Sequence, residues 1–299
     1  MSLIILIGAL DQGLIFAVLS LGLFVAFRIL DLPDLTVDGS FVTGLALCGM
    51  ACLSGHYLIG LLLAFIGGGI AGVFTGILHT KLKIQAILAG ILTMTALYSI
   101  NLKIMKLKPS IIFYDKDTIF SFIEGKFMLA GLDISKTVLL AFIVIVITAL
   151  LLYFLKTQLG LSLRATGDNE VMVRSSSINT DFTKILGFAI CNALVGLSGG
   201  IYIEYTKQAS YTVGVGMLVL SLASIIIGEA IFPHKSMLKH LVAVVIGSII
   251  YRFFITFAFQ LGLPSSDLKL FSALIVIIAI SIPVFKTNYR KMRKKYARN

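Results

Sequence analysis

Four charged side chains lie inside long apolar stretches of this 299-residue chain, and each needs a partner or a function. They are Asp11, Glu204, Glu229 and Arg252. If these stretches cross a membrane as helices, each charge costs about 2.5–3.5 kcal/mol. At about 1.5 Å of rise per helical residue, Asp11 and Arg252 lie at similar depths below one membrane surface. We therefore expect them to form a buried ion pair, in a structural role rather than as a solute contact.

Two further carboxylates, Asp34 and Asp38, flank Thr36 and follow Pro33 at the entrance to another apolar stretch. A proline beside closely spaced carboxylates is typical of a broken helix or a tight cap. Two interpretations stay open: the pair borders a solute pathway or its gate, or Asp34 caps a helix and Asp38 faces solvent. The candidates for the pathway or gate are Asp34, Asp38, Asn192 and Glu229.

Side-chain clusters typical of catalysis or metal binding are not evident in the sequence. The four histidines fall at the predicted membrane edges, and the buried acids are dispersed along the chain. Cys48 and Cys52 share a helix face, but they and Cys191 lie in apolar runs without a metal-binding spacing, so we interpret them as core residues. The sequence therefore predicts no catalytic residue and no metal or cofactor bound by this chain.

The elements that position these residues are expected to be transmembrane helices. The chain is 58% apolar and 13% charged, with a mean hydropathy of +1.02. Soluble domains are about 45–50% apolar and about 25% charged. This composition excludes an ordinary soluble enzyme, a disordered chain and a nucleic-acid-binding domain.

Nine runs are apolar over roughly the 20 residues that a membrane-spanning helix needs. They cover residues 3–27, 35–53, 57–78, 84–105, 137–155, 185–205, 213–232, 238–261 and 268–285. Alternating segments typical of a β-barrel do not occur. The predicted fold class is all-α, a polytopic membrane helical bundle of about nine (8–10) transmembrane helices in a single domain, residues 1–299.

The net charge of +11 comes mostly from a basic tail, residues 286–299, which has no acidic side chain. Lys and Arg accumulate on the cytoplasmic side of membrane proteins. If the tail is cytoplasmic and the spans alternate, 16 of the 25 Lys and Arg residues are cytoplasmic, 8 are outside and Arg252 is within a span. We therefore expect the N-terminus outside and the C-terminus in the cytoplasm.

Two connections are too long or too polar to be simple turns. The outer one, residues 101–136, is open to three interpretations: a re-entrant or surface helix, a surface that docks an outside partner, or a lid that packs on its own bundle. The inner one, residues 156–184, lies on the cytoplasmic side.

A helix of two to three turns is predicted within the inner segment. Gly167 would end the preceding element, Asp168 would cap the new helix, and Glu170 would favour its positive N-terminal end. Asn179 would close the helix in a left-handed conformation. The helix would expose Val171, Met172 and Arg174. It would pack in a groove of a partner or lie on lipid headgroups.

The order and spacing of several motifs resemble one family along essentially the whole chain. Residues 164–170 (RATGDNE), followed by Ile178-Asn179, resemble the cytoplasmic coupling segment of ABC importer permeases, specifically the branched-chain amino acid and ribose permease family. The small-residue stretch 187–200 is similar to the span that follows it there. Residues 32–40 (LPDLTVDGS), 98–102 (YSINL) and 247–252 (GSIIYR) resemble the subgroup described as tryptophan or tyrosine permeases. One departure is Ser177, where the family usually has glycine.

This resemblance implies a type II-like ABC importer permease in the bacterial plasma membrane. Two copies would pair as a homodimer in the lipid bilayer, each against a cytoplasmic ATP-binding subunit that holds ATP and Mg²⁺. An extracytoplasmic solute-binding lipoprotein would deliver a small solute, with an aromatic amino acid favoured. The implied coupling residues are Arg164, Gly167, Asp168, Asn169, Glu170, Met172, Arg174, Ile178 and Asn179.

Other functional classes agree less well with the sequence. The chain has no phosphate-binding Gly-x-x-x-x-Gly-Lys-Ser/Thr motif, so ATP hydrolysis would belong to a separate subunit and the chain itself would be no enzyme. An ion-coupled secondary transporter of a small metabolite is the alternative, but it gives no reason for the helix within 164–179. A membrane-embedded enzyme would need its acids and histidines clustered at one depth.

Overall fold

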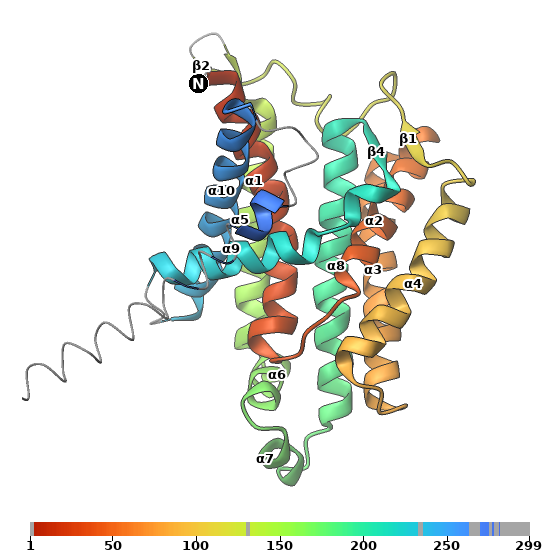
Figure 1. Ribbon diagram of the computed structural model, residues 1–299, viewed down its shortest axis with the longest axis vertical. Helices are drawn as coiled ribbons and strands as arrows, with labels where there is room; N and C mark the ends of the chain where they lie inside the picture. Colours follow the sequence, from red (N-terminus) through yellow and green to blue (C-terminus); the bar gives the residue numbers. More distant parts are fainter. Residues whose placement is uncertain are drawn as a thin grey trace, which may run out of the picture.

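The computed structural model describes residues 3–129, 132–232, 236–262, 270–274, 277 and 281, and nearly all of its regular structure is helical (Figure 1). In chain order the elements are α1 (Leu3–Phe24), the π-helix η1 (Val25–Ile29), α2 (Val37–Leu53), α3 (Tyr57–Thr80), α4 (Ala86–Ile104), β1 (Ser110–Ile112), β2 (Met128–Leu129), β3 (Leu132–Asp133), α5 (Ser135–Lys156), α6 (Gln158–Asp168), α7 (Glu170–Ser175), α8 (Thr180–Thr206), β4 (Gln208–Ser210), the 3₁₀-helix η2 (Tyr211–Gly214), α9 (Met217–Ile231) and α10 (Met237–Gln260).

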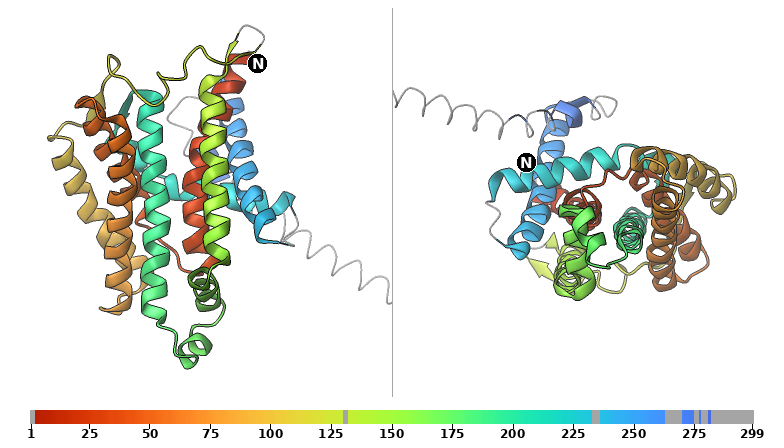
Figure 2. Two further views of the ribbon diagram at one scale, coloured as in Figure 1. Left: turned by 180° about the vertical axis from the view of Figure 1, so that it is seen from behind. Right: turned by 90° about the horizontal axis from the view of Figure 1, so that it is seen from below.

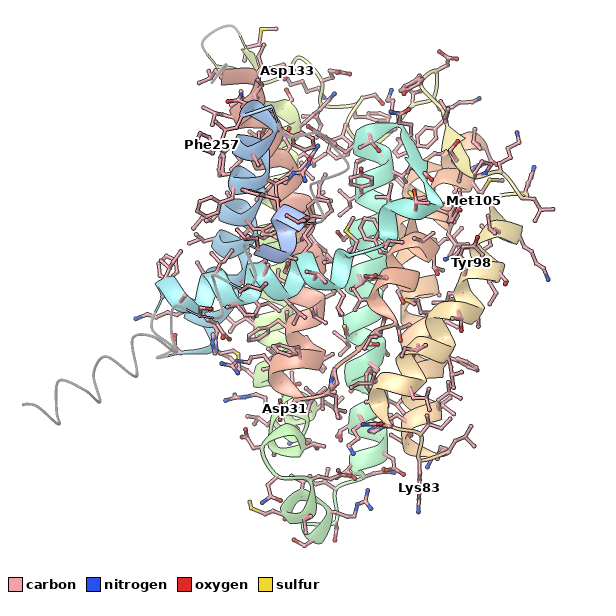
Figure 3. All side chains as sticks on the ribbon, in the orientation of Figure 1. Asp31, Lys83, Tyr98, Met105, Asp133 and Phe257 are labelled. Carbon is pink, nitrogen blue, oxygen red and sulfur yellow. The ribbon has the colours of Figure 1, made fainter. Side chains whose placement is uncertain are left out.

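The long helices run roughly along one axis, so the bundle has two distinct ends (Figures 1 and 2). The loop end carries the start of α1 and all four short strands, and the α7 end carries α6, α7 and the turn between α3 and α4. Figure 3 places Asp133 at the loop end and Lys83 at the α7 end. Residues 101–136 and 156–184 therefore lie at opposite ends of the bundle, as the predicted alternation of spans requires.

Seven apolar helical segments in the described part of the chain are long enough to cross a membrane, one of them being η2 and α9 counted together as Tyr211–Ile231, and α2 is a shorter apolar helix of 17 residues. Eight of the nine predicted runs thus coincide with apolar helices, while the ninth, 268–285, lies largely outside the described residues. The polytopic helical bundle is confirmed, and the count of about nine is not.

One predicted span, residues 213–232, does not run along the bundle. Its helix α9 has 15 residues, or about 22 Å, against a bilayer core of about 30 Å. Figures 1 and 2 show α9 lying across the other helices at mid-height. The chain returns from the loop end through β4 and η2 before α9 begins. Hydropathy thus predicted the apolar helix correctly, but it could not predict the direction in which the helix runs.

The connection between α4 and α5 folds back over the bundle. Its described residues form short strands and turns, so the interpretation as a re-entrant or surface helix was wrong. β1 pairs antiparallel with β4, with Ser110 opposite Ser210. Ile111, Phe113 and Phe120 are buried. These contacts favour the interpretation of an ordered lid over the loop end.

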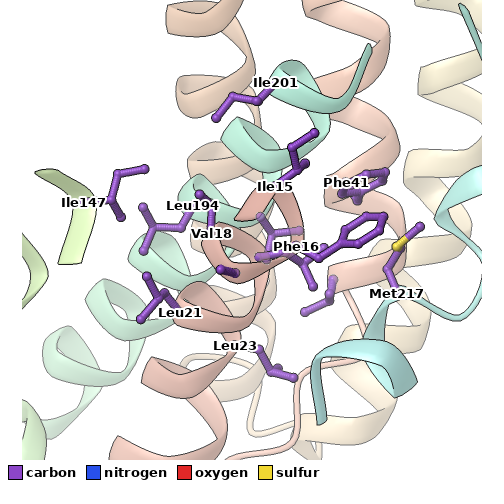
Figure 4. Close-up of a cluster of buried hydrophobic side chains, with 14 of the residues drawn as sticks. Ile15, Phe16, Val18, Leu21, Leu23, Phe41, Ile147, Leu194, Ile201 and Met217 are labelled. Carbon is purple, nitrogen blue, oxygen red and sulfur yellow. The ribbon is translucent and has the colours of Figure 1, made fainter. Parts of the chain in front are cut away.

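Helix α8 lies at the centre of the bundle and packs against α1, α2 and α3. Small residues let the backbones touch: a Cβ on Gly44 of α2 would overlap the carbonyl of Gly196 in α8, and one on Gly72 of α3 would overlap the carbonyl of Phe188. Close approach of this kind is how helices associate in lipid. Figure 4 shows the apolar cluster beside these contacts, which includes Ile15, Phe16, Phe41, Leu194, Ile201 and Met217.

Substituting Gly44 by alanine tests this packing. We expect Gly44→Ala to lower the free energy of unfolding by about 1–3 kcal/mol, because the new methyl group meets a backbone that cannot give way. Gly8→Ala is the matched control, since a Cβ on Gly8 of α1 meets nothing within 4 Å. That control should be neutral or stabilising, as alanine favours helices by about 1 kcal/mol over glycine. Thermal unfolding in detergent measures both, and equal effects would contradict the packing argument.

Candidate functional site

Two groups of residues were predicted to carry function, and the structure places them apart. The first is the coupling segment, residues 156–184, at the α7 end. The second is the set of polar side chains buried within the bundle.

Helix α6 connects the coupling segment to the bundle. Thr157 caps its start, accepting a hydrogen bond from the Gly160 amide at 3.3 Å. Gly167 is the penultimate residue of α6, so the helix ends at Asp168, one residue later than the predicted break. A Cβ on Gly167 would overlap the carbonyl oxygen of Ile29, the last residue of η1. Glycine at this position is therefore explained by close packing of α6 on η1.

Helix α7 differs from the prediction in its length and in both of its caps. It has six residues, and Asn169 caps it by accepting from the Met172 amide at 3.0 Å, whereas Asp168 is the last residue of α6. Asn179 does not close α7 in a left-handed conformation. It caps the start of α8 instead, accepting from the Phe182 amide at 3.1 Å.

The left-handed residue after α7 is Ser177, with φ +63°. Glycine adopts this conformation without steric cost, whereas serine carries a Cβ penalty. The sequence thus has a serine, where the family usually has glycine, at a position whose backbone conformation favours glycine.

An ionic cluster anchors α7 to α8. Glu170 accepts from Lys184 at 2.7 Å and from Arg174 at 3.0 Å, and Arg174 also contacts Thr180 at 2.8 Å and Asp181 at 3.4 Å. The hydrogen bond from Lys184 holds the pKa of the Glu170 carboxyl below its ordinary value, although burial opposes this. The Arg174 side chain is therefore engaged within the segment.

What the segment offers to a partner is a short apolar surface. Val171 is 80% exposed and Met172 is 65% exposed. Both belong to a helix that is fixed by its Asn169 cap and by the ion pairs of Glu170. Arg164 is exposed and Ile178 is half-buried. An apolar pair on a fixed helix can fill a groove of a partner protein with little loss of conformational entropy.

Asp34 supports the break before α2. Its carboxylate, 1% exposed, accepts from the Thr36 amide at 2.9 Å and from Asn192 Nδ2 of α8 at 2.6 Å. The Thr36 hydroxyl contacts that of Thr75 in α3 at 2.7 Å, and Thr75 donates to Thr93 in α4 at 2.9 Å. This polar chain joins the segment between η1 and α2 to the three helices α3, α4 and α8. Asp34 and Asn192 therefore stabilise the non-helical segment that precedes α2.

Asp38 is engaged by protein rather than facing solvent freely. Its two oxygens accept from the amides of Gly216 at 3.0 Å and Leu218 at 2.8 Å, at the N-terminus of α9. A carboxylate at that end is favoured by the helix dipole. Asp38 also borders a cavity of about 260 Å³ between α2, α4 and η2. Its other lining residues include Val42, Met94, Thr95, Tyr98, Asn101, Tyr211 and Val215.

Glu229 has a partner that the sequence analysis missed. Arg28 of η1 donates to it twice, at 2.7 and 3.1 Å, and His240 Nε2 of α10 lies 3.3 Å from it. The contact joins the end of α1 to α9 and α10. A signal was present in the sequence: Arg28 directly follows the run 3–27 and Glu229 is near the end of the run 213–232, and both of these ends are cytoplasmic in the predicted alternation of spans.

The predicted ion pair between Asp11 and Arg252 is absent, although the structure describes both residues. Ser248 of α10 donates to the Gly13 carbonyl of α1 at 2.9 Å, so the predicted similarity in depth was right. Asp11, however, accepts from Thr137 and Tyr205, while the Arg252 guanidinium lies 5.6 Å from the centre of the Phe16 ring. Sequence distance along a helix indicates height but leaves the direction of a side chain open.

The polar chain at Asp34 can be tested with two buried asparagines. Asn192→Leu removes a hydrogen bond to a carboxylate, which contributes about 1.5–3 kcal/mol. Asn101→Leu removes only a donor to the Gly39 carbonyl at 3.2 Å, which contributes about 0.5–1.5 kcal/mol. We expect Asn192→Leu to lower the unfolding free energy more, measured by denaturant titration in mixed micelles. Equal losses would show that Asp34 does not depend on Asn192.

The lowered pKa of Glu170 predicts a pH dependence of α7. The stabilisation is fully present above the ordinary glutamate pKa, about 4.3, and is lost as the pH falls through the lower pKa of the folded state. Amide hydrogen exchange in α7, corrected for intrinsic rates, should therefore accelerate at that acidic limit. Glu170→Gln should remove this pH dependence, whereas Glu124→Gln at the loop end should retain it. Unchanged behaviour in Glu170→Gln would contradict the assignment.

Comparison with known proteins adds an independent line of evidence. A sequence model of the family described as branched-chain amino acid transport system, permease component, matches residues 5–281. The tyrosine transport system permease protein of Clostridioides difficile is 39% identical over 97% of this chain and 95% of its own length. An uncharacterized protein of Rickettsia prowazekii is 33% identical over 93% of this chain and 97% of its own length.

A more distant relative is the ribose import permease protein of Haemophilus influenzae, which is 24% identical over 92% of this chain and 83% of its own length. No solved structure matches the chain. The family match covers nearly every element of the bundle, from α1 through α10. This chain therefore belongs to the family of permease components of branched-chain amino acid transport systems.

Proposed function

We propose that this chain is the transmembrane permease subunit of an ATP-driven ABC importer in the bacterial plasma membrane. The observation that carries the proposal is α7, a capped and ion-paired helix that presents Val171 and Met172 at one end of the bundle. Membership of a permease family supports it. In this proposal α7 inserts into a groove of a cytoplasmic ATP-binding subunit, which holds the ATP and Mg²⁺.

The same proposal sets the orientation and the assembly. The α7 end faces the cytoplasm, so the N-terminus and the lid face outside. The basic tail, residues 286–299, lies outside the described residues and is cytoplasmic in this proposal. Two copies of the permease pair in the bilayer, and an extracytoplasmic solute-binding lipoprotein docks at the loop end. The distribution of basic residues in the sequence supports this orientation.

For the solute, we propose an amino acid with an aromatic side chain, tyrosine being favoured. The support is the 39% identical relative named as a tyrosine transport system permease. Among the four pathway candidates, Asp38 borders the described cavity of about 260 Å³, where Tyr98 and Tyr211 meet edge to face at 5.5 Å. We place the solute pathway beside this cavity, whereas Asp34, Asn192 and Glu229 hold helices together.

The test is uptake of labelled tyrosine into proteoliposomes that contain the permease, its ATP-binding subunit and its solute-binding protein. We expect ATP-dependent uptake that requires the ATP-binding subunit. Met172→Asp should weaken binding of that subunit roughly 30-fold, the effect of losing about 2 kcal/mol at a central apolar contact. Uptake should fall with it while the thermal stability of the permease is unchanged.

Leu82→Asp is the matched control, because Leu82 is a 63% exposed apolar residue at the same end but outside the coupling segment. It should bind the ATP-binding subunit normally. Uptake that persists without this subunit would overturn the proposal in favour of an ion-coupled secondary transporter. Normal coupling in Met172→Asp would show that α7 is not the docking helix, and uptake of another solute alone would reject tyrosine.

A further inference from the structure

Three potential metal ligands meet at the loop end of the bundle, between α2 and α8. The Sγ atoms of Cys48 and Cys52 are 3.9 Å apart, and Cys48 Sγ lies 3.3 Å from Oε1 of Glu204. One ligand atom from each of the three residues lies within 4.8 Å of the others. All three side chains are fully buried. From their apolar surroundings and the absence of a metal-binding spacing, both cysteines were predicted to be core residues, and the proximity of Glu204 was not expected.

The spacing of these atoms fits a single tetrahedral cation. Bonds of about 2.3 Å to sulfur and about 2.0–2.2 Å to a carboxylate oxygen place two sulfurs about 3.8 Å apart. The same bonds place a sulfur and an oxygen about 3.5–3.7 Å apart. The observed sulfur–sulfur separation of 3.9 Å is within about 0.1 Å of the first value, and the observed sulfur–oxygen separation of 3.3 Å is about 0.2–0.4 Å shorter than the second.

Glu204 has no cationic partner among the described residues. Within the described part of the chain, its oxygens accept from the Cys48 thiol and from the Ile119 amide, at 2.8 Å, and none of the ion pairs includes it. The carboxylate oxygens have further lone pairs that a cation can use. The Ile119 amide would orient the carboxylate as an outer-sphere partner, as ligating carboxylates require.

We propose that Cys48, Cys52 and Glu204 bind one thiophilic divalent cation of the zinc type, with a water molecule as fourth ligand. Thiolate is the form of cysteine that binds a metal, so two thiol protons leave to solvent for each cation bound. Two thiolates, one carboxylate and the cation then carry a net charge of −1, the same as two thiols and one carboxylate. Binding therefore adds no net charge to the buried site.

The bound cation would join α2 to α8 directly beneath the lid. The covering residues are Ile119, through its hydrogen bond to Glu204, and Phe120, whose ring meets Tyr205 edge to face at 5.8 Å. The site is independent of the coupling segment and of the proposed solute, so its test does not depend on the proposed function.

The experiment uses Co²⁺ as the probe on purified full-length permease in detergent under reducing conditions. We expect one Co²⁺ per chain, a thiolate-to-cobalt charge-transfer band in the near ultraviolet and the visible bands of tetrahedral cobalt. Zn²⁺ should displace the Co²⁺, because zinc binds such sites more tightly. Absence of the charge-transfer band in the unmodified permease overturns the proposal.

Three cysteine variants localise the site. Cys48→Ser and Cys52→Ser should show no two-thiolate spectrum at Co²⁺ concentrations that saturate the parent. Cys191→Ser is the matched control, since Cys191 is equally buried in α8 but lies outside the cluster, and it should retain the full band. Size-exclusion profiles and thermal midpoints establish that each variant is folded. A band that persists in both Cys48→Ser and Cys52→Ser, or disappears in Cys191→Ser, overturns the proposal.

Discussion

The close approach of α8 to its neighbours is the constraint on which the rest of the structure depends. Lipid is as apolar as leucine, so burying apolar side chains does not by itself pull helices together in a bilayer. Glycines such as Gly44, Gly72 and Gly196 instead let backbones touch and gain dispersion contacts. With α8 held at the centre, polar residues along its length reach their partners: Asn179 caps it at one end, Asn192 binds Asp34 midway, and Glu204 meets the cysteines at the other end.

Two interruptions of regular helix lie inside this bundle, and each is stabilised by a carboxylate. In lipid a free backbone amide or carbonyl is costly, so a broken helix persists only where protein groups satisfy it. Asp34 supports the segment before α2, and Asp38 accepts from the first amides of α9. The carboxylates are thus part of the architecture that allows α2 to begin partway along the bundle and α9 to lie across it.

Direct contacts lead from the coupling segment into this architecture. Glu170 binds Lys184 at the base of α8, and Gly167 packs on the carbonyl of Ile29 in η1. Arg28, in the same π-helix, binds Glu229 of α9. A π-helix is a frequent feature of functional sites, because its wider turn disrupts the regular hydrogen bonding. These packed and ion-paired groups connect the segment that carries α7 with both α8 and the crossing helix α9.

Much of this molecule was determined by the sequence alone, since hydropathy and length are local properties. The membrane class, the position of eight apolar helices and the placement of the coupling segment at the opposite end from the lid all followed from them. Local rules were less reliable at α7, where Asn169 rather than Asp168 is the cap, because adjacent capping residues compete and packing selects one of them.

Only the tertiary structure decided the partners of the buried charges and the direction of α9. Counting residues along a helix gives the height of a side chain, and that height was right for Asp11 and Arg252. The rotation of each helix about its axis decides which neighbour a side chain meets, and that rotation is set by packing against several helices at once. Asp11 consequently faces Thr137 and Tyr205, and Glu204 lies beside two cysteines more than 150 residues away.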